Sequence, residues 1–498
     1  MGSNCLKTNL PLYHGMAILL CSGFLFCLGR TTLAEAQTQG GDWSGPYRLS
    51  GEEGEVGRAS LAADPYGYVH AFWVESGLHD DRSLIQYARF DGEAWAGPVD
   101  IHVTWPGIPV AAKAVALDQA GLIHLVWTEG ARGPIYYTRA PASDALSARQ
   151  WPKPVRLDLP ARGVALQADS PGVIHLLYTD LQEATGVYYV QSRDQGAHWS
   201  SPQRLDPDIP PGVAPTEAGL ALDEAGRLHA FWLYLDLDNP DAPGKSIRYA
   251  RSLDGGATWS PPMTIDEEDE EAGELRAPGP LWAVQAQNVH VIWAGDAVAH
   301  REQRFSTDAG QTWSRTSRIF GELHGQAGDA VAVDGAGRLH FVAQMRYPQG
   351  LYHACWDRGG WPTPSLFYLI ARDASDPIGE RIHAHGLSLA VRAGNQLVVT
   401  FFDRRNGKNG PLYAMHRTLD DLPPLLARPV PTPTPLPLPG PILSSVVITP
   451  TPAEPRSGLG SAPPPGQLLA PGSVVGAGVA TALLLAASTI ACRLLRRH

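Results

Sequence analysis

The feature that most constrains this chain is a set of short motifs that recur along it at nearly even spacing. Ser-x-Asp-x-Gly-x-x-Trp occurs three times, and a Trp that opens a short segment of the Trp-x-x-Pro type occurs seven times, at positions 43, 95, 151, 199, 259, 313 and 361. Successive copies of this Trp are 48 to 60 residues apart, and each unit holds four short alternating or apolar runs separated by turn residues. A sheet of four strands cannot cover both of its faces alone, so such units must stack on one another.

A second motif, Asp-x-x-Gly-x-x-His, keeps the same order relative to the first, at 64–70, 118–124, 169–175, 223–229 and 334–340. The composition, with 18% charged residues, 52 Gly, 44 Pro and 14 Trp, is typical of many short strands with frequent turns. We therefore predict an all-β, seven-bladed propeller over residues 42–418, or a six-bladed one if one copy does not form a blade. The segment 43–49 has the character of a fourth strand and 411–417 that of a third strand, so we expect the two to pair and close the ring.

The three full copies of the first motif resemble the Asp-box, or bacterial neuraminidase repeat, of the sialidase superfamily of propellers. Their residues are Ser192, Asp194, Gly196, Trp199, Ser252, Asp254, Gly256, Trp259, Ser306, Asp308, Gly310 and Trp313. Each residue type suits a tight turn, because Ser and Asp accept hydrogen bonds from turn amides, Gly adopts positive φ, and Trp anchors the hairpin. The resemblance implies a sialidase-like propeller in which these turns lie away from the catalytic pocket.

Six repeated histidines also have a structural rather than a catalytic interpretation: His70, His124, His175, His229, His290 and His340. Residues placed identically in six blades are spread around a ring, so most of them cannot meet one ligand. We expect each of these histidines to be buried and to bond the backbone of a neighbouring strand.

Candidate ligand-binding residues lie in the loops that lead into the innermost strands, on the face opposite the repeated turns. These loops carry Arg58, Arg162, Arg276 and Arg381. The planar guanidinium suits a carboxylate, sulfate or phosphate, and the resemblance to sialidases implies a cluster of arginines on the carboxylate of an acidic sugar. The alternative is that each arginine pairs with a local acid, such as Glu55, Glu274 or Glu380, and only ties its loop down.

The catalytic residues of a sialidase are not assignable from this sequence. The closest match to the family's Tyr/Phe-Arg-Ile-Pro stretch is Tyr-Arg-Leu-Ser at 47–50, which lacks Pro, and no Tyr-Glu pair stands out. Asp80, Asp81 and Asp329 are equivalent candidates for a loop acid. We expect no cofactor and no metal, because the acidic run 266–274 lacks a spaced ligand pattern, and His383 and His385 lack further ligands.

The two ends of the chain predict export and membrane anchoring. Residues 1–36 have the character of a signal peptide, residues 420–473 form a Pro-rich extended stalk, 474–492 form an uncharged stretch long enough to span a membrane as a helix, and 493–498 form a short basic cytoplasmic tail. The propeller would then lie outside the cell as the ectodomain of a single-pass, bacterial-type membrane protein. It contains one cysteine, Cys355, so no intrachain disulfide is possible there.

The sequence therefore favours a surface-anchored binding or interaction module, whose partner on the loop face is an acidic glycan or a protein. The alternative is an exo-acting glycoside hydrolase of sialidase type, and a third interpretation is a structural envelope protein. The net charge of -11 and the absence of a Lys/Arg-rich run in the body of the chain exclude nucleic acid from the expected partners.

Overall fold

The computed structural model describes residues 42–430, except 52–53, 78–80, 131, 170–171, 181–184, 238–243, 268–275, 296–299, 326–327, 347–348, 358–359, 371–382 and 406–407. The predicted signal peptide, the predicted spanning helix, the basic tail and nearly all of the predicted stalk lie outside these residues. Among the residues that are described, no helix is long and apolar enough to cross a membrane.

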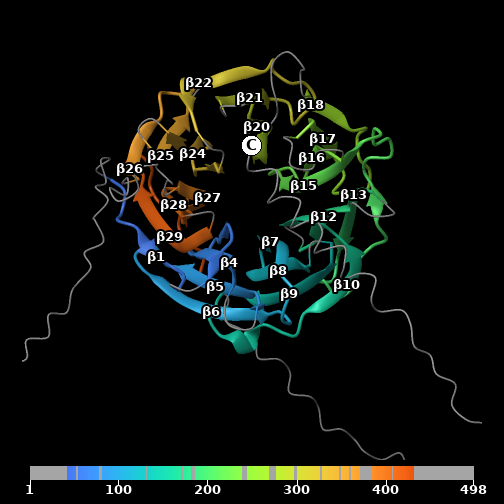
Figure 1. Cartoon of the computed structure of the whole chain (residues 1–498), viewed down its shortest axis with the longest axis horizontal. Coiled ribbons are helices and arrows are strands. Elements are labelled where there is room, and N and C mark those ends of the chain that lie inside the picture. Colours follow the sequence, from blue (N-terminus) through green and yellow to red (C-terminus); the bar gives the residue numbers. More distant parts are fainter. Residues whose placement is uncertain are drawn as a thin grey trace, which may run out of the picture. The chain divides into compact units, whose positions relative to one another are not determined.

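The described residues form seven antiparallel sheets, which are the blades of a ring (Figure 1). Blades 1 to 3 consist of β2 (Glu55–Val56), β3 (Ser60–Ala63), β4 (Val69–Ser76), β5 (Leu84–Phe90) and β6 (Trp95–Val103); β7 (Val110–Leu117), β8 (Leu122–Glu129), β9 (Pro134–Pro141) and β10 (Val155–Pro160); and β11 (Gly163–Ala168), β12 (Ile174–Asp180), β13 (Gly186–Ser192) and β14 (Gln203–Arg204).

Blades 4 to 7 follow in chain order. They consist of β15 (Val213–Leu222), β16 (Leu228–Asp236), β17 (Ser246–Ser252) and β18 (Met263–Glu267); β19 (Arg276–Gln285), β20 (Asn288–Ala294), β21 (His300–Ser306) and β22 (Ser317–His324); β23 (Ala330–Val333), β24 (Leu339–Arg346), β25 (Gln349–Trp356) and β26 (Ser365–Leu369); and β27 (His383–Arg392), β28 (Gln396–Arg405), β29 (Lys408–Thr418) and β1 (Tyr47–Arg48).

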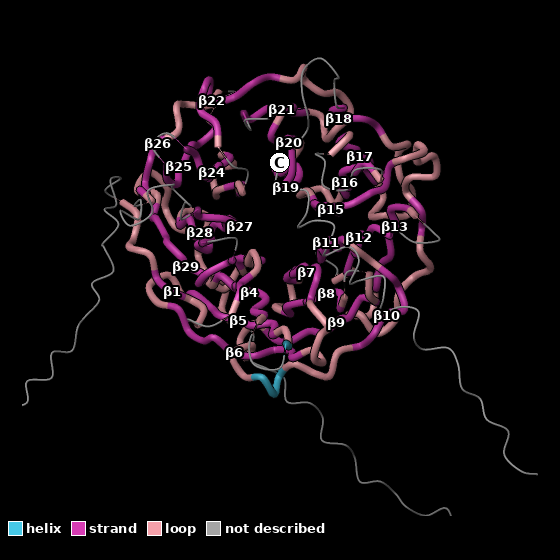
Figure 2. Tube along the Cα trace, viewed as in Figure 1, coloured by secondary structure: helices cyan, strands magenta, loops and turns pink. Residues whose placement is uncertain are grey.

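Blade 7 joins the two ends of the propeller. β1 pairs with β29 in antiparallel register, with Tyr47 opposite Ala414, and Trp43 forms a further bridge with Arg417. The prediction of an all-β propeller with seven blades is confirmed, and so is the expected pairing of its first and last strands. The six-bladed alternative is wrong. Figure 2 shows how little helix the described chain contains, and the 3-10 turn η2 (Ala148–Gln150) lies at the rim of the ring.

The core lies between the blades rather than within any one of them. The second strand of a blade is covered on both faces by neighbouring sheets, so β4 and β16 have near-continuous buried runs instead of an alternating pattern. Trp73, Trp127 and Trp232, which occupy equivalent positions in β4, β8 and β16, are fully buried in these layers. The stacking of seven sheets therefore gives a large core to a chain whose strands are short.

The Ser-x-Asp-x-Gly-x-x-Trp segments form the turns between the third and fourth strands of blades 3, 4 and 5. In blade 4, the Ser252 hydroxyl donates to Asp254 Oδ1 (2.8 Å), the Gly256 N–H donates to Ser252 Oγ (2.8 Å), and the Thr258 N–H donates to Asp254 Oδ1 (2.8 Å). Blades 3 and 5 repeat these bonds. Several backbone amides of the turn are thereby satisfied by two side chains.

The glycine of this turn also contacts the preceding blade, and we call such a contact between neighbouring blades a joint. Gly256 has φ +90°, and a Cβ at this position would lie 2.1 Å from the hydroxyl of Tyr189 in blade 3. Gly196 and Gly310 have the same relation to Tyr137 and Tyr249. Glycine is therefore required both for the backbone conformation and for the close approach of the tyrosine ring.

Five of the six repeated histidines are buried and His290 is partly exposed. Their ring nitrogens contact side chains, so the expectation that they bond strand backbone is wrong. His124 Nδ1 lies 2.8 Å from the Tyr137 hydroxyl and its Nε2 lies 3.3 Å from Asp118 Oδ2; the same hydroxyl lies 2.8 Å from the carbonyl oxygen of Gln195 in the next blade. Blades 1, 3 and 4 contain the equivalent Asp, His and Tyr. His70 bonds both neighbours, whereas Nε2 of His175 and of His229 lies 3.4 and 3.6 Å from its Asp without a hydrogen bond. The turn thus brings the motif's Asp back onto its own His, and the backbone stays in the sheet.

Candidate ligand-binding site

The inner strands of four blades, which surround the centre of the ring, are each interrupted by a break or a register shift. In blade 1 the inner strand is broken into β2 and β3, and Arg58 lies in the break. The register shifts in β7 between Val110 and Lys113, in β15 between Thr216 and Gly219, and in β27 between His385 and Ser388. Such irregularities redirect side chains and end the ladder locally, and they are frequent beside binding sites.

These irregular segments line a cavity of about 910 Å³, which we call the central cavity. Its charged lining residues come from the first halves of inner strands and from the loops beside them, and we call this side of the ring the cavity face. The opposite face, formed by the turns that hold Gly196, Gly256 and Gly310, is called the turn face. Among the described residues, the polar and aromatic ones that line the central cavity are Arg58, Ser60, Lys113, Arg132, Arg162, Thr216, Glu217, Trp282, Trp293, Asp329 and Ser388.

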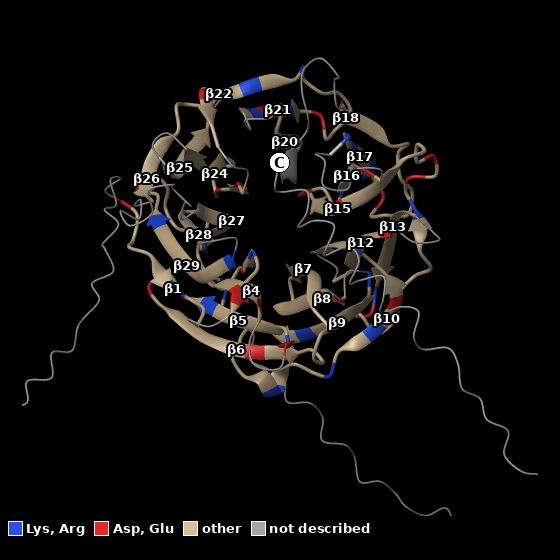
Figure 3. Ribbon diagram, viewed as in Figure 1, with Lys and Arg blue, Asp and Glu red and all other residues tan. Residues whose placement is uncertain are grey.

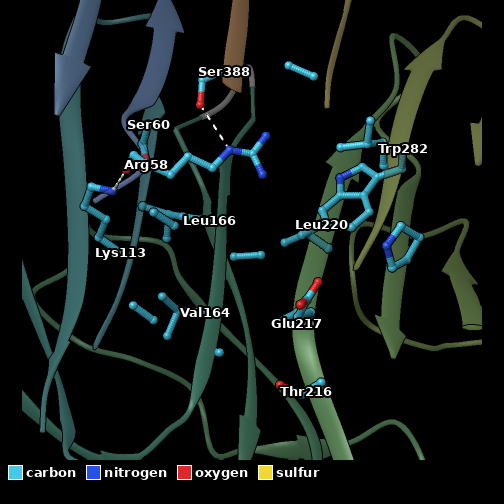
Figure 4. Close-up of a pocket in the computed structure, with 18 of the residues that line it drawn as sticks. Arg58, Ser60, Lys113, Val164, Leu166, Thr216, Glu217, Leu220, Trp282 and Ser388 are labelled. Atoms are coloured by element: carbon cyan, nitrogen blue, oxygen red, sulfur yellow. Dashed lines mark hydrogen bonds between the residues drawn. The ribbon is translucent and has the colours of Figure 1, made fainter. Parts of the chain in front are cut away.

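Arg58 extends into the central cavity from blade 1 (Figure 4). Its Nε donates to Ser388 Oγ (3.2 Å) in blade 7, and its Nη2 donates to the Asp329 carbonyl oxygen (3.3 Å) at the start of blade 6. Desolvation by the cavity walls lowers the pKa of Arg58, and the charges of Glu217 and Asp329 oppose that shift. The side chain stays exposed to solvent within the cavity, which offsets much of the desolvation, so the guanidinium keeps its charge.

Lys113 lies beside Arg58 and is half-buried. Its ammonium donates to the Arg58 carbonyl oxygen at 2.5 Å. Loss of solvation within the cavity, and secondly the positive charge of Arg58, lower the pKa of Lys113 to about 7. An anion bound near both side chains would raise this pKa, because it would stabilise the charged ammonium.

The four predicted arginines have different outcomes. Arg58 and Arg162 both line the central cavity, together with Arg132 from the loop between β8 and β9. Arg132 and Arg162 are exposed and have no side-chain partner among the described residues, and Arg58 bonds Ser388 and Asp329 rather than the local acid Glu55. Arg276 begins β19, where only the backbone is described, and Arg381 lies outside the described residues.

Among the described residues, two carboxylates line the same cavity, those of Asp329 and Glu217. Asp329 accepts two hydrogen bonds from Arg301, at 2.6 Å from Nε and 2.8 Å from Nη2, and Arg301 is fully buried beneath it. This bidentate pair engages both carboxylate oxygens of Asp329 within the protein. Glu217 sits in the bulge of β15 with φ +48°, a conformation that is strained for a residue other than glycine and that is often found at functional sites.

Trp282 gives the central cavity an aromatic wall across from Arg58 (Figure 4). Its indole stacks on Phe231, with ring centroids 5.4 Å apart and planes at 9°. Gly219 makes this position possible, because a Cβ there would lie 2.3 Å from the indole ring. The cavity thus combines a rigid apolar surface with several cations and hydroxyls.

Sequence reasoning missed Lys113, Arg132, Glu217 and Trp282. Lys113 and Glu217 are isolated charges within otherwise apolar inner-strand runs, VAAKAVAL and VAPTEAGL, and this mismatch was the available signal. The described lining contains no tyrosine, so it provides no Tyr-Glu pair. Within the same described residues, no group of three or more His, Cys, Asp or Glu side chains could hold a metal ion.

Several solved structures are similar to this chain at low identity. A protein of unknown function from Dyadobacter fermentans is 13% identical, with a TM-score of 0.45, over 78% of this chain and 100% of its own. A mutant of the NanB sialidase from Streptococcus pneumoniae is 12% identical, with a TM-score of 0.43, over 76% of this chain and 71% of its own. The GH93 alpha-L-arabinofuranosidase of Fusarium graminearum is 14% identical, with a TM-score of 0.40, over 62% of this chain and 93% of its own.

No protein-family model matches the sequence. No curated protein is significantly similar to it. The structural similarities are too distant to carry an argument about chemistry, and the seven-bladed architecture is established by the strand pairings of the chain itself.

Proposed function

We propose that this protein is a binding module that takes an acidic saccharide into the central cavity. The observation that carries the proposal is the charge balance of the cavity wall. Among the described residues, four basic side chains, Arg58, Lys113, Arg132 and Arg162, share one cavity with two carboxylates, of which Asp329 is held by Arg301. Such a surplus of positive charge in a concave site favours a carboxylate or sulfate group on the ligand.

A saccharide fits better than a small inorganic anion, because the cavity wall contains an aromatic ring and hydroxyl groups as well as charged side chains. Trp282 supplies a flat apolar surface for the C–H face of a sugar ring, and Ser60 and Thr216 supply hydroxyls among the cavity-lining groups. The volume of about 910 Å³ lies near the top of the range of roughly 300–1,000 Å³ that is common for small-molecule sites. A ligand of more than one sugar ring is therefore compatible with the cavity.

We also propose that the propeller is held outside the cell by the C-terminal segment. Support comes from the apolar stretch 474–492, the arginines that follow it and the Pro-rich segment 420–473 that precedes it. Protease treatment of intact cells tests this placement, because an external propeller is degraded while a cytoplasmic control protein survives. Survival of the propeller would contradict it.

The binding test is calorimetric titration of D-glucuronate, N-acetylneuraminate and D-glucose into the full-length protein. We expect at least one of the two acids to bind, D-glucose to bind more weakly, and the double variant Arg58→Gln/Arg162→Gln to lose about 100-fold in affinity, because charged hydrogen bonds contribute about 1.5–3 kcal/mol each. The matched control is Arg139→Gln on the turn face, where Arg139 bonds Gln195, and this variant should bind normally. Equal affinity for D-glucose, or full affinity in the double variant, would contradict the proposal.

The alternative function is hydrolysis of an acidic glycoside, as the resemblance to the Asp-box propellers implies. Glu217 is the carboxylate of the described lining that could act in it, because it lies in the bulge of β15 at positive φ. A fluorogenic sialoside distinguishes the two functions. We expect no turnover, whereas turnover that disappears in Glu217→Gln would establish the hydrolase.

A further inference from the structure

The joint between blades 5 and 6 departs from the pattern of the three joints that precede it, between blades 2 and 3, 3 and 4, and 4 and 5. In blades 2 to 4 a tyrosine of the third strand reaches the turn of the next blade, as Tyr249 does to Gly310. In blade 5 the position of Tyr249 is occupied by Gln303 of β21. The position of Arg251 in blade 4 is occupied by Phe305. The next turn begins with Trp356 where the full motif has serine.

The polar groups of this joint are satisfied in a different way. The Gln303 side-chain amide donates to His290 Nδ1 (2.8 Å), and the Trp361 indole N–H donates to the Gln303 side-chain oxygen (2.7 Å). Phe305 stacks on His290 with centroids 5.8 Å apart, and Trp356 packs edge-on to both rings at 5.5 and 5.6 Å. An aromatic cluster has thus replaced the hydrogen-bonded tyrosine of the regular joints.

A cavity of about 320 Å³ opens at this joint, on the turn face, and we call it the joint pocket. It is lined by the partly exposed rings of His290, Phe305 and Trp356, and at its rim by the amides of Gln285 and Asn288 and by Thr307. None of these residues lines the central cavity. The volume lies at the low end of the range for small-molecule sites, which suits one ring rather than a chain of rings.

The joint pocket offers no available positive charge among its described residues. Arg338 reaches it, but the guanidinium is engaged by Asp334 and Asp421, which raise its pKa. Desolvation lowers the pKa of His290 to about 4, so this imidazole is neutral near pH 7. The described lining therefore offers an acidic ligand no free positive charge, in contrast to the central cavity.

We propose that the joint pocket is a second ligand site, which binds a single neutral sugar ring against Phe305 and Trp356. A pyranose presents C–H groups on a face and hydroxyls around its edge, which matches aromatic rings within the pocket and amides at its rim. A purely aromatic ligand would cover the rings but would leave the amides of Gln285 and Asn288 without the bonds that hydroxyls supply. This site is independent of the proposed acidic ligand, and the two sites lie on opposite faces of the ring.

The test is saturation-transfer NMR of the full-length protein with the methyl glycosides of D-glucose, D-galactose and D-mannose, in the presence of saturating D-glucuronate to occupy the central cavity. We expect at least one glycoside to receive saturation, mainly at its C–H face. Phe305→Ala should weaken this binding about tenfold, in keeping with the loss of one aromatic contact. The matched control is Gln191→Ala, the equivalent position in blade 3, which should not change it.

A second variant guards against a loss that is due to misfolding. Phe305→Arg introduces the residue found at this position in blade 4, fills the pocket with a charged side chain, and should abolish glycoside binding while the thermal transition stays close to that of the wild type. Absence of saturation for all three glycosides, binding that survives in Phe305→Arg, or saturation of indole but of none of the glycosides would each overturn the proposal.

Discussion

The turn face and the cavity face of the propeller use the same seven blades in opposite ways. On the turn face, blades 2 to 4 repeat one set of contacts, in which an Asp, a His and a Tyr of one blade meet the turn of the next. On the cavity face, each blade supplies something different: Arg58 from a broken strand, Lys113 from beyond a bulge and Glu217 from within another. Figure 3 shows that charged residues are nevertheless interspersed around the whole ring.

This contrast shows how a repeat protein separates stability from recognition. A contact that recurs in several blades is a joint, because every joint must satisfy the same geometry between neighbouring sheets. A residue that occurs in one blade only and departs from the strand pattern is free to serve a ligand. The joint pocket between blades 5 and 6 follows the same logic, since it opens where the repeated contact has been replaced.

The largest expected loss of stability comes from a residue beside the central cavity. Arg301 is buried there and pairs with Asp329, which lines the cavity. Arg301→Met leaves the Asp329 carboxylate without its bidentate partner and should lower the free energy of unfolding by about 3–5 kcal/mol. The double variant Arg301→Met/Asp329→Asn should recover most of this loss, because no buried charge then remains. Urea unfolding measures both, and a double variant no more stable than the single one would show that packing, not charge, causes the loss.

A smaller loss is expected on the turn face, from the glycine of a joint. Gly256→Ala should lower the free energy of unfolding by about 3 kcal/mol, because it combines positive φ with a clash against Tyr189. Gly255→Ala is the matched control, since Gly255 has φ +67° and a Cβ there meets nothing within 4 Å; it should cost only about 1 kcal/mol. Equal costs for the two variants, measured by thermal and urea unfolding, would mean that the clash does not matter.

The buried histidines of the joints predict a dependence of stability on pH. Desolvation lowers the pKa of His229 to about 4, against the weaker opposing effect of Asp223, and Arg227 and Arg251 lower it further. Between pH 6.5 and 4 the unfolded chain binds a proton that the folded chain does not, so stability should fall on acidification by up to about 1.4 kcal/mol per pH unit for this group.

The measurement is the free energy of unfolding at pH 7 and pH 5 for the wild type and His229→Gln. The variant should show the shallower decrease, because it lacks one of the titrating groups. A decrease of the same size in both proteins would assign the acid sensitivity to other residues.

The smallest expected effect is a change in ligand affinity at the central cavity. Glu217→Gln removes a negative charge from the central cavity and keeps the shape of the side chain, so affinity for D-glucuronate should rise by about tenfold. Weaker binding in Glu217→Gln would show instead that the carboxylate accepts a hydrogen bond from the ligand.

The regular parts of this molecule could be predicted from sequence, and the irregular parts could not. The repeated motifs predicted seven blades of four strands. The need to leave no open sheet edge predicted that β1 pairs with β29. The bulges of β7 and β15 did not follow, because a register shift depends on how neighbouring blades pack rather than on any local motif. The order of strands predicted that Arg58 and Arg162 lie in loops at the start of inner strands, and both line the central cavity. Lys113 and Glu217 could not be placed there without knowledge of the bulges.

The partners of the histidines illustrate the same limit. The sequence motif already contained both Asp118 and His124, but only the folded turn shows that the carboxylate reaches the ring. The third member, Tyr137, comes from the next strand, and its contact with Gln195 comes from the next blade. Contacts between blades depend on the geometry of the ring, which a single repeat does not encode.

The central claim is that the repeated turns hold the frame while the irregular inner strands bind the ligand. Paired measurement of D-glucuronate affinity and unfolding free energy in Gly256→Ala and Arg58→Gln tests it most directly. We predict that Gly256→Ala loses stability and keeps its affinity at a temperature where it is fully folded, and that Arg58→Gln loses affinity and keeps its stability. The reverse result, with affinity lost in the turn variant and retained in the cavity variant, would contradict the account.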